Sequence, residues 1–154
     1  MRTLPLLAVL ALLLGACSGS PTEFLQEPIP MNTGGDDAPP VRIAEGTFSG
    51  ASGHTVTGTA ALFQNEDGSH FVRLENLSSD NGPDLEVWLV RRTSGNVGDG
   101  GLSMGELLST QGNQNYFPPN GTDYSVYLGV SIWCRRFGVN FGTARFRTLP
   151  AGSS

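Results

Sequence analysis

The two cysteines of this 154-residue chain are the residues whose positions could support chemistry. Cys17 ends the tetrapeptide Leu-Gly-Ala-Cys, directly after a run of leucine and alanine, whereas Cys134 lies far along the chain. A positively charged start, an apolar stretch too short to span a bilayer as a permanent helix, and small residues before a cysteine are typical of a bacterial lipoprotein signal. The sequence therefore predicts a signal peptide over residues 1–16, removed by cleavage, and acylation of Cys17.

Acylation of Cys17 would hold the protein on a membrane, because each buried CH₂ of an acyl chain contributes roughly 0.8 kcal/mol. Ser18 follows the cysteine, where an aspartate would be the alternative sorting signal, and by resemblance to lipoprotein sorting this favours the outer membrane if the host has two membranes. We therefore expect a lipid-anchored protein of the bacterial cell envelope. The alternative is an ordinary secretory peptide that a cysteine follows by chance.

Lipidation of Cys17 would leave Cys134 without a disulfide partner in its own chain. A thiol outside the cytoplasm meets oxidants and disulfides unless it is shielded, ligated or used. Arg135 and Arg136 follow Cys134, and a guanidinium near the sulfur favours the thiolate, which is the reactive and metal-binding form. Successive side chains of a strand point to opposite faces, so Arg136 is the better candidate to share the side of the sulfur. The alternative is that Cys134 is a small hydrophobic residue of the core.

The composition limits the classes of partner and the number of domains. All nine basic residues are arginine, and 14 acidic residues give a formal net charge of −5, which argues against binding to nucleic acid. The chain also lacks the motifs of serine hydrolases, zinc proteases and phosphate-binding loops. After loss of the signal peptide, the remaining length suits one modest domain with a single core.

Residues 17–44 are rich in proline, glycine and polar residues and show no sustained apolar period, so we expect the lipidated cysteine to be followed by a disordered tether. Such a tether would hold the domain about 30 Å from the lipid on average. The folded domain is predicted to cover residues 45–150, with a short tail over residues 151–154. The tether is expected to set the distance between the domain and the membrane, and we predict no catalytic or binding residue in it.

The domain consists of short segments of β-type composition separated by turn residues. The predicted strands lie within residues 46–50, 54–63, 71–76, 84–90, 123–134 and 137–146. The longest candidate, residues 123–134, alternates apolar and polar residues and places Cys134 on the apolar face. Residues 102–108 are the one candidate for a helical turn, and Gly142 is a candidate β-bulge. Turn signals at this spacing predict an all-β domain, an antiparallel β-sandwich or a barrel-like fold.

Several segments, taken in order and spacing, resemble the DM13 domain. They are Gly46-Thr47-Phe48, His54-x-Val56-x-Gly58-x-Ala60, Gly82-Pro83-Asp84-Leu85-x-Val87-x-Leu89, Val130-x-Ile132-Trp133-Cys134-x-x-Phe137 and Phe141-Gly142-x-Ala144. The resemblance spans nearly all of the chain after the predicted tether. It implies a β-rich extracytoplasmic module with a proposed role in electron transfer. That role centres on Cys134, as a bare thiol or as the ligand of a prosthetic group such as haem.

His54 matches the histidine position of the family and is the natural second member of a site with Cys134. A neutral imidazole can ligate haem iron or relay a proton to or from a thiol, although an exposed histidine at the start of a strand is the alternative. No Cys-x-x-Cys-His motif is present, so any haem would be held non-covalently, and a closed zinc site is not expected. Trp133 could stack beside a planar cofactor or pack in the core. Asp84, a supporting residue, flanks a Gly-Pro turn and could supply an oxygen ligand to calcium, although turn chemistry explains the residue adequately.

The sequence thus predicts a lipid-anchored redox domain that exchanges electrons with an extracytoplasmic partner protein and need not be an enzyme in the strict sense. The main alternative is a non-catalytic binding or adhesion module of the cell envelope, in which Cys134 is packing. A third interpretation is a disulfide between two molecules through Cys134, which requires an exposed sulfur.

Overall fold

The computed structural model describes residues 24–31 and 38–150, so the predicted signal peptide, Cys17 and the tail over residues 151–154 lie outside the described residues. The strands are β1 (Leu25–Gln26), β2 (Val41–Gly50), β3 (Val56–Gln64), β4 (His70–Ser79), β5 (Leu85–Val90), β6 (Leu102–Glu106), β7 (Gln111–Tyr116), β8 (Gly129–Cys134), β9 (Val139–Arg145) and β10 (Arg147–Thr148), with one 3₁₀ helix, η1 (Tyr124–Val126). They form a single sheet in the order β1-β7-β4-β3-β2-β9-β8-β5-β6, with β10 paired to β2. The predicted all-β class is confirmed.

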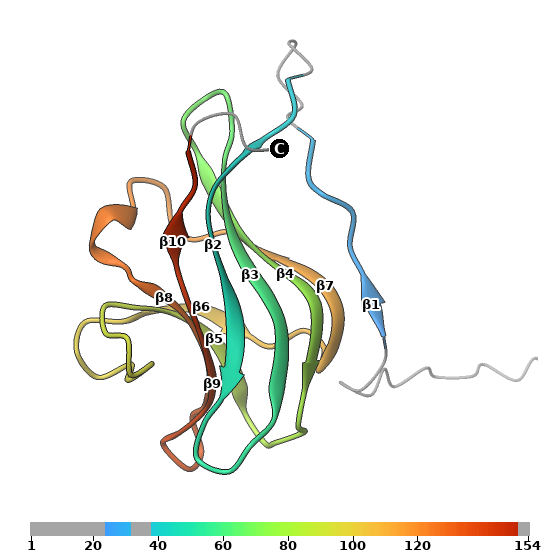
Figure 1. Cartoon of the computed structure of the whole chain (residues 1–154), viewed down its shortest axis with the longest axis vertical. Coiled ribbons are helices and arrows are strands. Elements are labelled where there is room, and N and C mark those ends of the chain that lie inside the picture. The colour runs from blue at the N-terminus through green and yellow to red at the C-terminus, as the bar shows by residue number, and fades with distance from the viewer. Residues whose placement is uncertain (1–23, 32–37, 151–154) are drawn as a thin grey trace, which may run out of the picture.

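Strand β2 bends the sheet into a barrel-like shape. Its residues 41–47 pair with β3, whereas residues 48–50 pair with β9, so that two halves of the sheet share one strand. The β9-β8-β5 half curls over the β3-β4-β7 half, and one hydrophobic core contains residues from both (Figure 1). Residues 107–110 join β6 to β7 and close one end, because Leu107 donates its N–H to Leu85 of β5 and Thr110 accepts from Ser79 of β4.

The alternation predicted for β5 is confirmed by burial. Leu85, Val87 and Leu89 all belong to the main core. The side chains between them point to the other face, where the Trp88 indole N–H donates to Glu86 at 2.8 Å. Alternation along a strand with one apolar face fixes its register, because a slip by one residue would move every core side chain to the other side.

The single long strand predicted over residues 123–134 is wrong in its first half. Asp123 caps η1, with its carboxylate accepting from both the backbone N–H and the hydroxyl of Ser125. The β8 strand starts only at Gly129, and Leu128 is 45 % exposed before it. An aspartate that bonds the backbone two residues on offers the chain a local alternative to the sheet ladder, and here that alternative prevails.

Residues 102–108, predicted as a helical turn, form β6 and the link that follows it. Strand β6 pairs antiparallel with β5, which would otherwise present unpaired backbone groups along that side. Gly105 has a φ of 103°, a backbone conformation outside the right-handed helix. The need to pair the edge of β5 therefore outweighs the local apolar spacing.

The tether predicted over residues 17–44 is ordered in two of its parts. Strand β2 begins at Val41, so the folded domain starts earlier than the predicted boundary at residue 45. Strand β1 pairs in parallel with β7 at the edge of the sheet. Beyond β1, the backbone carbonyl of Glu27 accepts a hydrogen bond from the buried guanidinium of Arg73 at 2.9 Å. The Glu27 carboxylate accepts another from the N–H of Asn115 at 2.6 Å. The segment therefore covers an edge strand and helps to solvate a buried charge.

We expect Glu27→Ala to lower the free energy of unfolding by about 1–2 kcal/mol, because a charge-assisted hydrogen bond to a half-buried backbone N–H is lost. Urea unfolding followed by circular dichroism measures the change. Glu66→Ala is the matched control, since Glu66 is an exposed residue between β3 and β4. Equal stability of the two variants would show that the segment after β1 is not held by this contact.

Candidate functional site

Cys134 is the last residue of β8 and points into the main core. Its neighbours in the sheet are Leu85 on β5 and Val139 on β9, and its exposed fraction is 0 %. The side chain is a free thiol, as the sequence predicted for the folded domain. The predicted position on the apolar face of the strand is therefore confirmed, and the sulfur has no direct contact with solvent.

The loop before β5 closes over the sulfur. The thiol of Cys134 donates a hydrogen bond to the backbone carbonyl of Pro83 at 3.0 Å. Asp84 follows with a φ of 53°, in the left-handed region that aspartate tolerates better than most residues, and its carbonyl accepts from the N–H of Arg135 at 3.0 Å. Two hydrogen bonds, one from the Cys134 thiol and one from the Arg135 N–H, thus hold the turn of residues 83–84 against the end of β8.

The two arginines after Cys134 are paired with carboxylates. The Arg136 guanidinium donates to Asp84 at 3.0 Å, and Arg135 lies 3.5 Å from Glu86. The hydrogen bond of the sulfur goes to the Pro83 carbonyl and not to a guanidinium. Arg136, proposed from the sequence as a group that favours the thiolate, instead fastens the turn that covers the sulfur.

His54 lies in the turn between β2 and β3, outside the loop that covers Cys134. Its ring stacks on Phe141, with centroids 3.6 Å apart and planes 10° from parallel, and its Nδ1 is 3.7 Å from a carboxylate oxygen of Asp80. The same carboxylate accepts from the N–H of Thr55 at 2.8 Å. These contacts fix the imidazole at the surface, with one third of its side chain exposed.

Phe141 and Gly82 stand between His54 and the loop that covers Cys134. The pairing of β8 with β9 shifts between Ile132 and Trp133, which leaves Phe141 as the extra residue of a bulge. The bulge therefore lies at Phe141 and not at Gly142, the position predicted from the sequence, which pairs with Ile132. A Cβ on Gly82 would lie only 2.7 Å from the Phe141 ring, so glycine is needed for the loop to approach this closely. Phe141 and Gly82 thus pack between Cys134 and His54, and the two side chains do not face a common position where both could ligate one bound group.

Trp133 is not on the side of the sulfur. It precedes Cys134 on β8, and the pairing of Glu86 with Trp133 puts its side chain on the outer face of the sheet with Trp88 and Glu86. A planar group bound at Cys134 would lie on the inner face, so Trp133 could not stack on it without rearrangement of the strand. The sequence offered two roles for Trp133, stacking on a cofactor or packing in the core. The structure instead places it half-buried on the outer face of the sheet.

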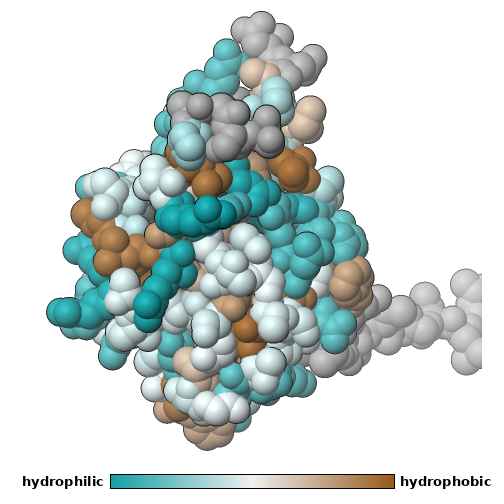
Figure 2. Space-filling model, in the orientation of Figure 1, coloured by the Kyte–Doolittle hydropathy of each residue, from teal (hydrophilic) through white to brown (hydrophobic). Residues whose placement is uncertain are grey.

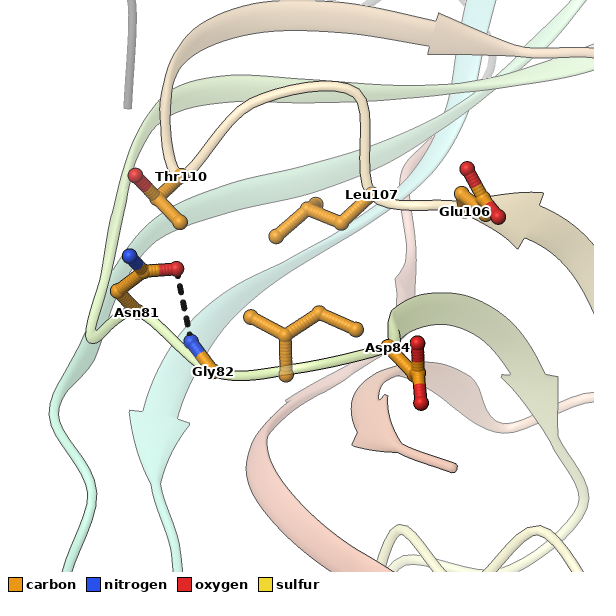
Figure 3. A pocket seen from close by; sticks show the side chains of 7 residues that line it. Asn81, Gly82, Asp84, Glu106, Leu107 and Thr110 are labelled. Atoms are coloured by element: carbon orange, nitrogen blue, oxygen red, sulfur yellow. Dashed lines mark hydrogen bonds between the residues drawn. The ribbon is translucent and has the colours of Figure 1, made fainter. Parts of the chain in front are cut away.

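A pocket of about 190 Å³ adjoins the site on the side of β6 (Figure 3). Asp84 and Glu106 lie at one end of it and Asn81 and Thr110 at the other, with Leu107 between them (Figure 3). Asp84 is the residue that this pocket shares with the turn over Cys134. The described residues contain no group of three or more side chains placed to hold a metal ion.

The geometry does not fit a haem ligated by Cys134 and His54. Drug-sized and cofactor-sized ligands occupy pockets of about 300–1,000 Å³, which exceeds the cavity beside Asp84. The sulfur is sealed in a packed core, and the Phe141 ring lies between the His54 ring and the Gly82 loop that covers the sulfur. The chemistry derived below therefore uses the chain's own residues and no bound group.

The absorption spectrum tests this conclusion. We expect the mature protein from an exporting, haem-replete host to show no Soret band, as isolated or after dithionite, because the site offers no space for a porphyrin. A Soret band that shifts on reduction and disappears in Cys134→Ser would contradict the structure of the closed site. Cys134→Ser is a suitable comparison because it keeps the size of the side chain.

Some of the site could not be anticipated from side-chain types. The group that accepts from the thiol is a backbone carbonyl, and Phe141 has no polar atom, so neither has a chemical signature in the sequence. The Gly-Pro-Asp-Leu order of residues 82–85 was the available signal, since it predicts a turn. His70, the second histidine, lies apart from this region, packs on Tyr124 with ring centroids 4.4 Å apart, and has its pKa lowered by burial.

Within the described part of the chain, no helix is long and apolar enough to cross a membrane. A family model described as "Electron transfer DM13" matches residues 47–146. The match includes His54, the turn at Asp84, Cys134 and Phe141. No curated protein and no solved structure gives a significant match.

Proposed function

Because this chain belongs to the DM13 electron transfer family, we propose that it transfers electrons outside the cytoplasm with Cys134 as its redox centre. The observation that carries the proposal is the place of Cys134. It is the only cysteine within the matched region, and it lies under the turn of Gly82, Pro83 and Asp84, which the same family model covers. The alternative redox groups of a protein, a bound metal or a haem, have no matching site among the described residues.

A single thiol can exchange electrons with the disulfide of a partner protein. The Cys134 thiol gives up its proton, and its sulfur attacks one sulfur of the partner's disulfide. A mixed disulfide forms while the other partner sulfur leaves as a thiolate. A thiol of a second partner, a dithiol protein, then attacks the Cys134 sulfur, and the first partner leaves with both of its sulfurs reduced to thiols. The other thiol of the dithiol partner attacks its own sulfur in the new mixed disulfide, which releases Cys134 as a thiol and leaves that partner oxidised to a disulfide. Since the domain has no second cysteine, the resolving thiols belong to the partner proteins.

The covering turn would control this exchange. In the closed structure the sulfur is fully buried and its proton is bonded to the Pro83 carbonyl. The contacts that hold the turn on its outer side are exposed, since the Arg136 and Asp84 side chains are 60 % and 40 % accessible. Exposed ion pairs contribute at most about 1 kcal/mol, so a partner that engages either residue could remove this contact at small cost, and the hydrogen bonds of Pro83 and Asp84 would then have to break for the turn to open.

The proposed location is the outer surface of a membrane, with the chain attached through an acylated Cys17. Six residues separate Cys17 from Phe24, the first residue that the structure describes before β1. Even fully extended, this stretch reaches about 25 Å. The edge formed by β1 and β7 would then stay within about 25 Å of the lipid, whereas a free tether of residues 17–44 would let the domain move further away. The redox partner would therefore be a membrane-proximal protein.

Burial of the thiol favours a second candidate function, a non-catalytic binding module of the cell envelope. A cysteine that is fully enclosed by leucine, valine and isoleucine side chains behaves as a small apolar residue. In that case Cys134→Ala would leave partner binding unchanged. The two candidates therefore differ in whether the sulfur is ever used.

The state of Cys134 in living cells tests the proposal. Cells that export the full chain are quenched in acid, free thiols are alkylated, and the protein is separated on a non-reducing gel and analysed by mass spectrometry. We expect part of the protein to carry a partner through Cys134, because the mixed disulfide is an obligatory intermediate. The species should be absent from Cys134→Ser.

Two results decide between the candidates. A mixed disulfide that accumulates when the second attack is blocked supports electron transfer and identifies the partner. Complete alkylation of Cys134 under every condition, together with an unchanged envelope phenotype of Cys134→Ser, would instead establish the binding module.

A further inference from the structure

The outer face of the sheet carries a polar pocket of about 340 Å³ that the redox proposal does not use. It lies over β2 and β9, on the face opposite to Cys134, and the loop after β5 forms one of its walls. Figure 2 shows pale residues of intermediate hydropathy over much of the face that it draws. The volume falls within the range of small-molecule sites.

Hydroxyl groups line this pocket. Thr47 and Ser49 project from β2, Thr143 lies opposite Ser49 on β9, and Thr93 and Ser94 come from the loop. No aspartate or glutamate lines it, although the chain carries 14 acidic residues and a net charge of −5. Hydroxyl groups can each donate one hydrogen bond, so the pocket presents several donors and no negative charge.

Arg145 is the one charged side chain in the lining. Six of the other described arginines pair with carboxylates, and Arg91 lies over the ring of Tyr127. Arg145 has neither kind of partner among the described residues. Its Nε donates to the carbonyl of Thr93 at 2.9 Å, which orients the guanidinium beside the loop and leaves its terminal nitrogens for a ligand.

The pocket is built before any ligand arrives. Asn140 bonds to the hydroxyl of Thr143 at 2.9 Å and to the carbonyl of Ser94 at 3.1 Å, and so ties the loop to the sheet. Gly95 is buried with a φ of 74°, and a Cβ there would lie 1.9 Å from the Thr143 hydroxyl and 2.4 Å from the Asn140 amide. Only glycine lets the loop approach so closely, which keeps the polar groups in fixed positions.

We propose that this pocket binds the oxyanion group, phosphate or carboxylate, of a small molecule. Arg145 would supply the charge through its terminal nitrogens, and the hydroxyls of Thr47 and Ser49 would donate to the remaining oxygens. Guanidinium groups match both oxyanions in geometry, and charge-assisted hydrogen bonds are about twice as strong as neutral ones. The proposal is independent of the redox function, since the two sites lie on opposite faces.

Titration of the full mature chain by ¹⁵N NMR tests the proposal, with inorganic phosphate, acetate and glucose as separate probes. We expect saturable shifts at residues 47–51, 93–95 and 140–145 and at the Arg145 Nε–H, with a dissociation constant in the millimolar range for at least one anion. Arg145→Gln should weaken binding about tenfold, because a charge-assisted contact is lost. Comparison of phosphate with acetate identifies the kind of oxyanion.

Arg147→Gln is the matched control for charge. It removes the same charge two residues further along the chain, where the guanidinium of Arg147 pairs with Glu45. Binding in this variant should stay within about twofold of the parent protein. Equal weakening by both variants would show a general charge effect and overturn the proposal. Saturable binding of glucose without competition from either anion would overturn it as well, and so would the absence of any saturable shift.

Discussion

In the folded protein, the Cys134 thiol should react with Ellman's reagent about a thousandfold more slowly than in protein unfolded by urea. The sulfur is fully buried, so reaction must wait for the turn of residues 83–84 to open. Local opening free energies range from near zero to the global stability, and about 4 kcal/mol corresponds to three factors of ten. The rate is measured by release of the coloured thiolate in a large excess of reagent.

Gly82→Ala should raise the rate in the folded protein about tenfold. The added Cβ would meet the Phe141 ring at 2.7 Å and the Leu85 side chain at 3.2 Å, so the loop must move outward. Gly98→Ala is the matched control, because its Cβ would meet only the Asn96 side chain, at 3.2 Å, and its φ is not positive. A protection that disappears entirely in Gly98→Ala would mean that the whole domain opens, not the turn alone.

A second result would contradict the proposal that the turn of residues 83–84 must open before Cys134 reacts. If the thiol of the parent protein reacts as fast as in urea, the sulfur is accessible without any opening step, and the closed structure does not describe the reactive state. Protection far above a thousandfold in the presence of a stable fold would instead place the thiol among inert core cysteines. The binding module would then be the better account of the family resemblance in this chain.

The faces of the strands could be predicted because alternation is a local property. The order Leu85, Val87, Leu89 on β5 and the apolar place of Cys134 on β8 follow from a period of two residues, and the core confirms both. The same reasoning failed at Asp123, where a side chain that caps a 3₁₀ turn competes with the strand. Polar side chains that bond their own backbone are the usual limit of such patterns.

The partners of the site could not be predicted because they arise from tertiary packing. Sequence reasoning brought His54 and Cys134 together as co-ligands, yet the structure separates them by Phe141 and Gly82. It also assigned Arg136 to the sulfur, whereas the guanidinium binds Asp84 across 52 positions of sequence. A contact between segments so far apart depends on the order of strands in the sheet. The alternation of residues within one strand does not predict that order.

Phe141→Ala should lower the free energy of unfolding by about 3–5 kcal/mol, the range for phenylalanine in a core. Phe141 is 4 % exposed and belongs to the main core, where its ring contacts His54 and closes on Gly82. The alanine would leave a cavity beneath the imidazole and beside the loop. Guanidinium unfolding gives the stability, and the slope of the transition shows whether unfolding remains cooperative.

Phe137→Ala provides the matched control within the same hairpin. Its ring is 66 % exposed, so truncation should change stability by no more than about 0.5 kcal/mol. Because Phe141 supports the loop from below, Phe141→Ala should also make Cys134 more reactive, whereas Phe137→Ala should leave the thiol protected. A large loss of stability without any gain in thiol reactivity would show that Phe141 does not hold the turn over Cys134. The turn would then depend on the contacts of Pro83 and Asp84 with the end of β8.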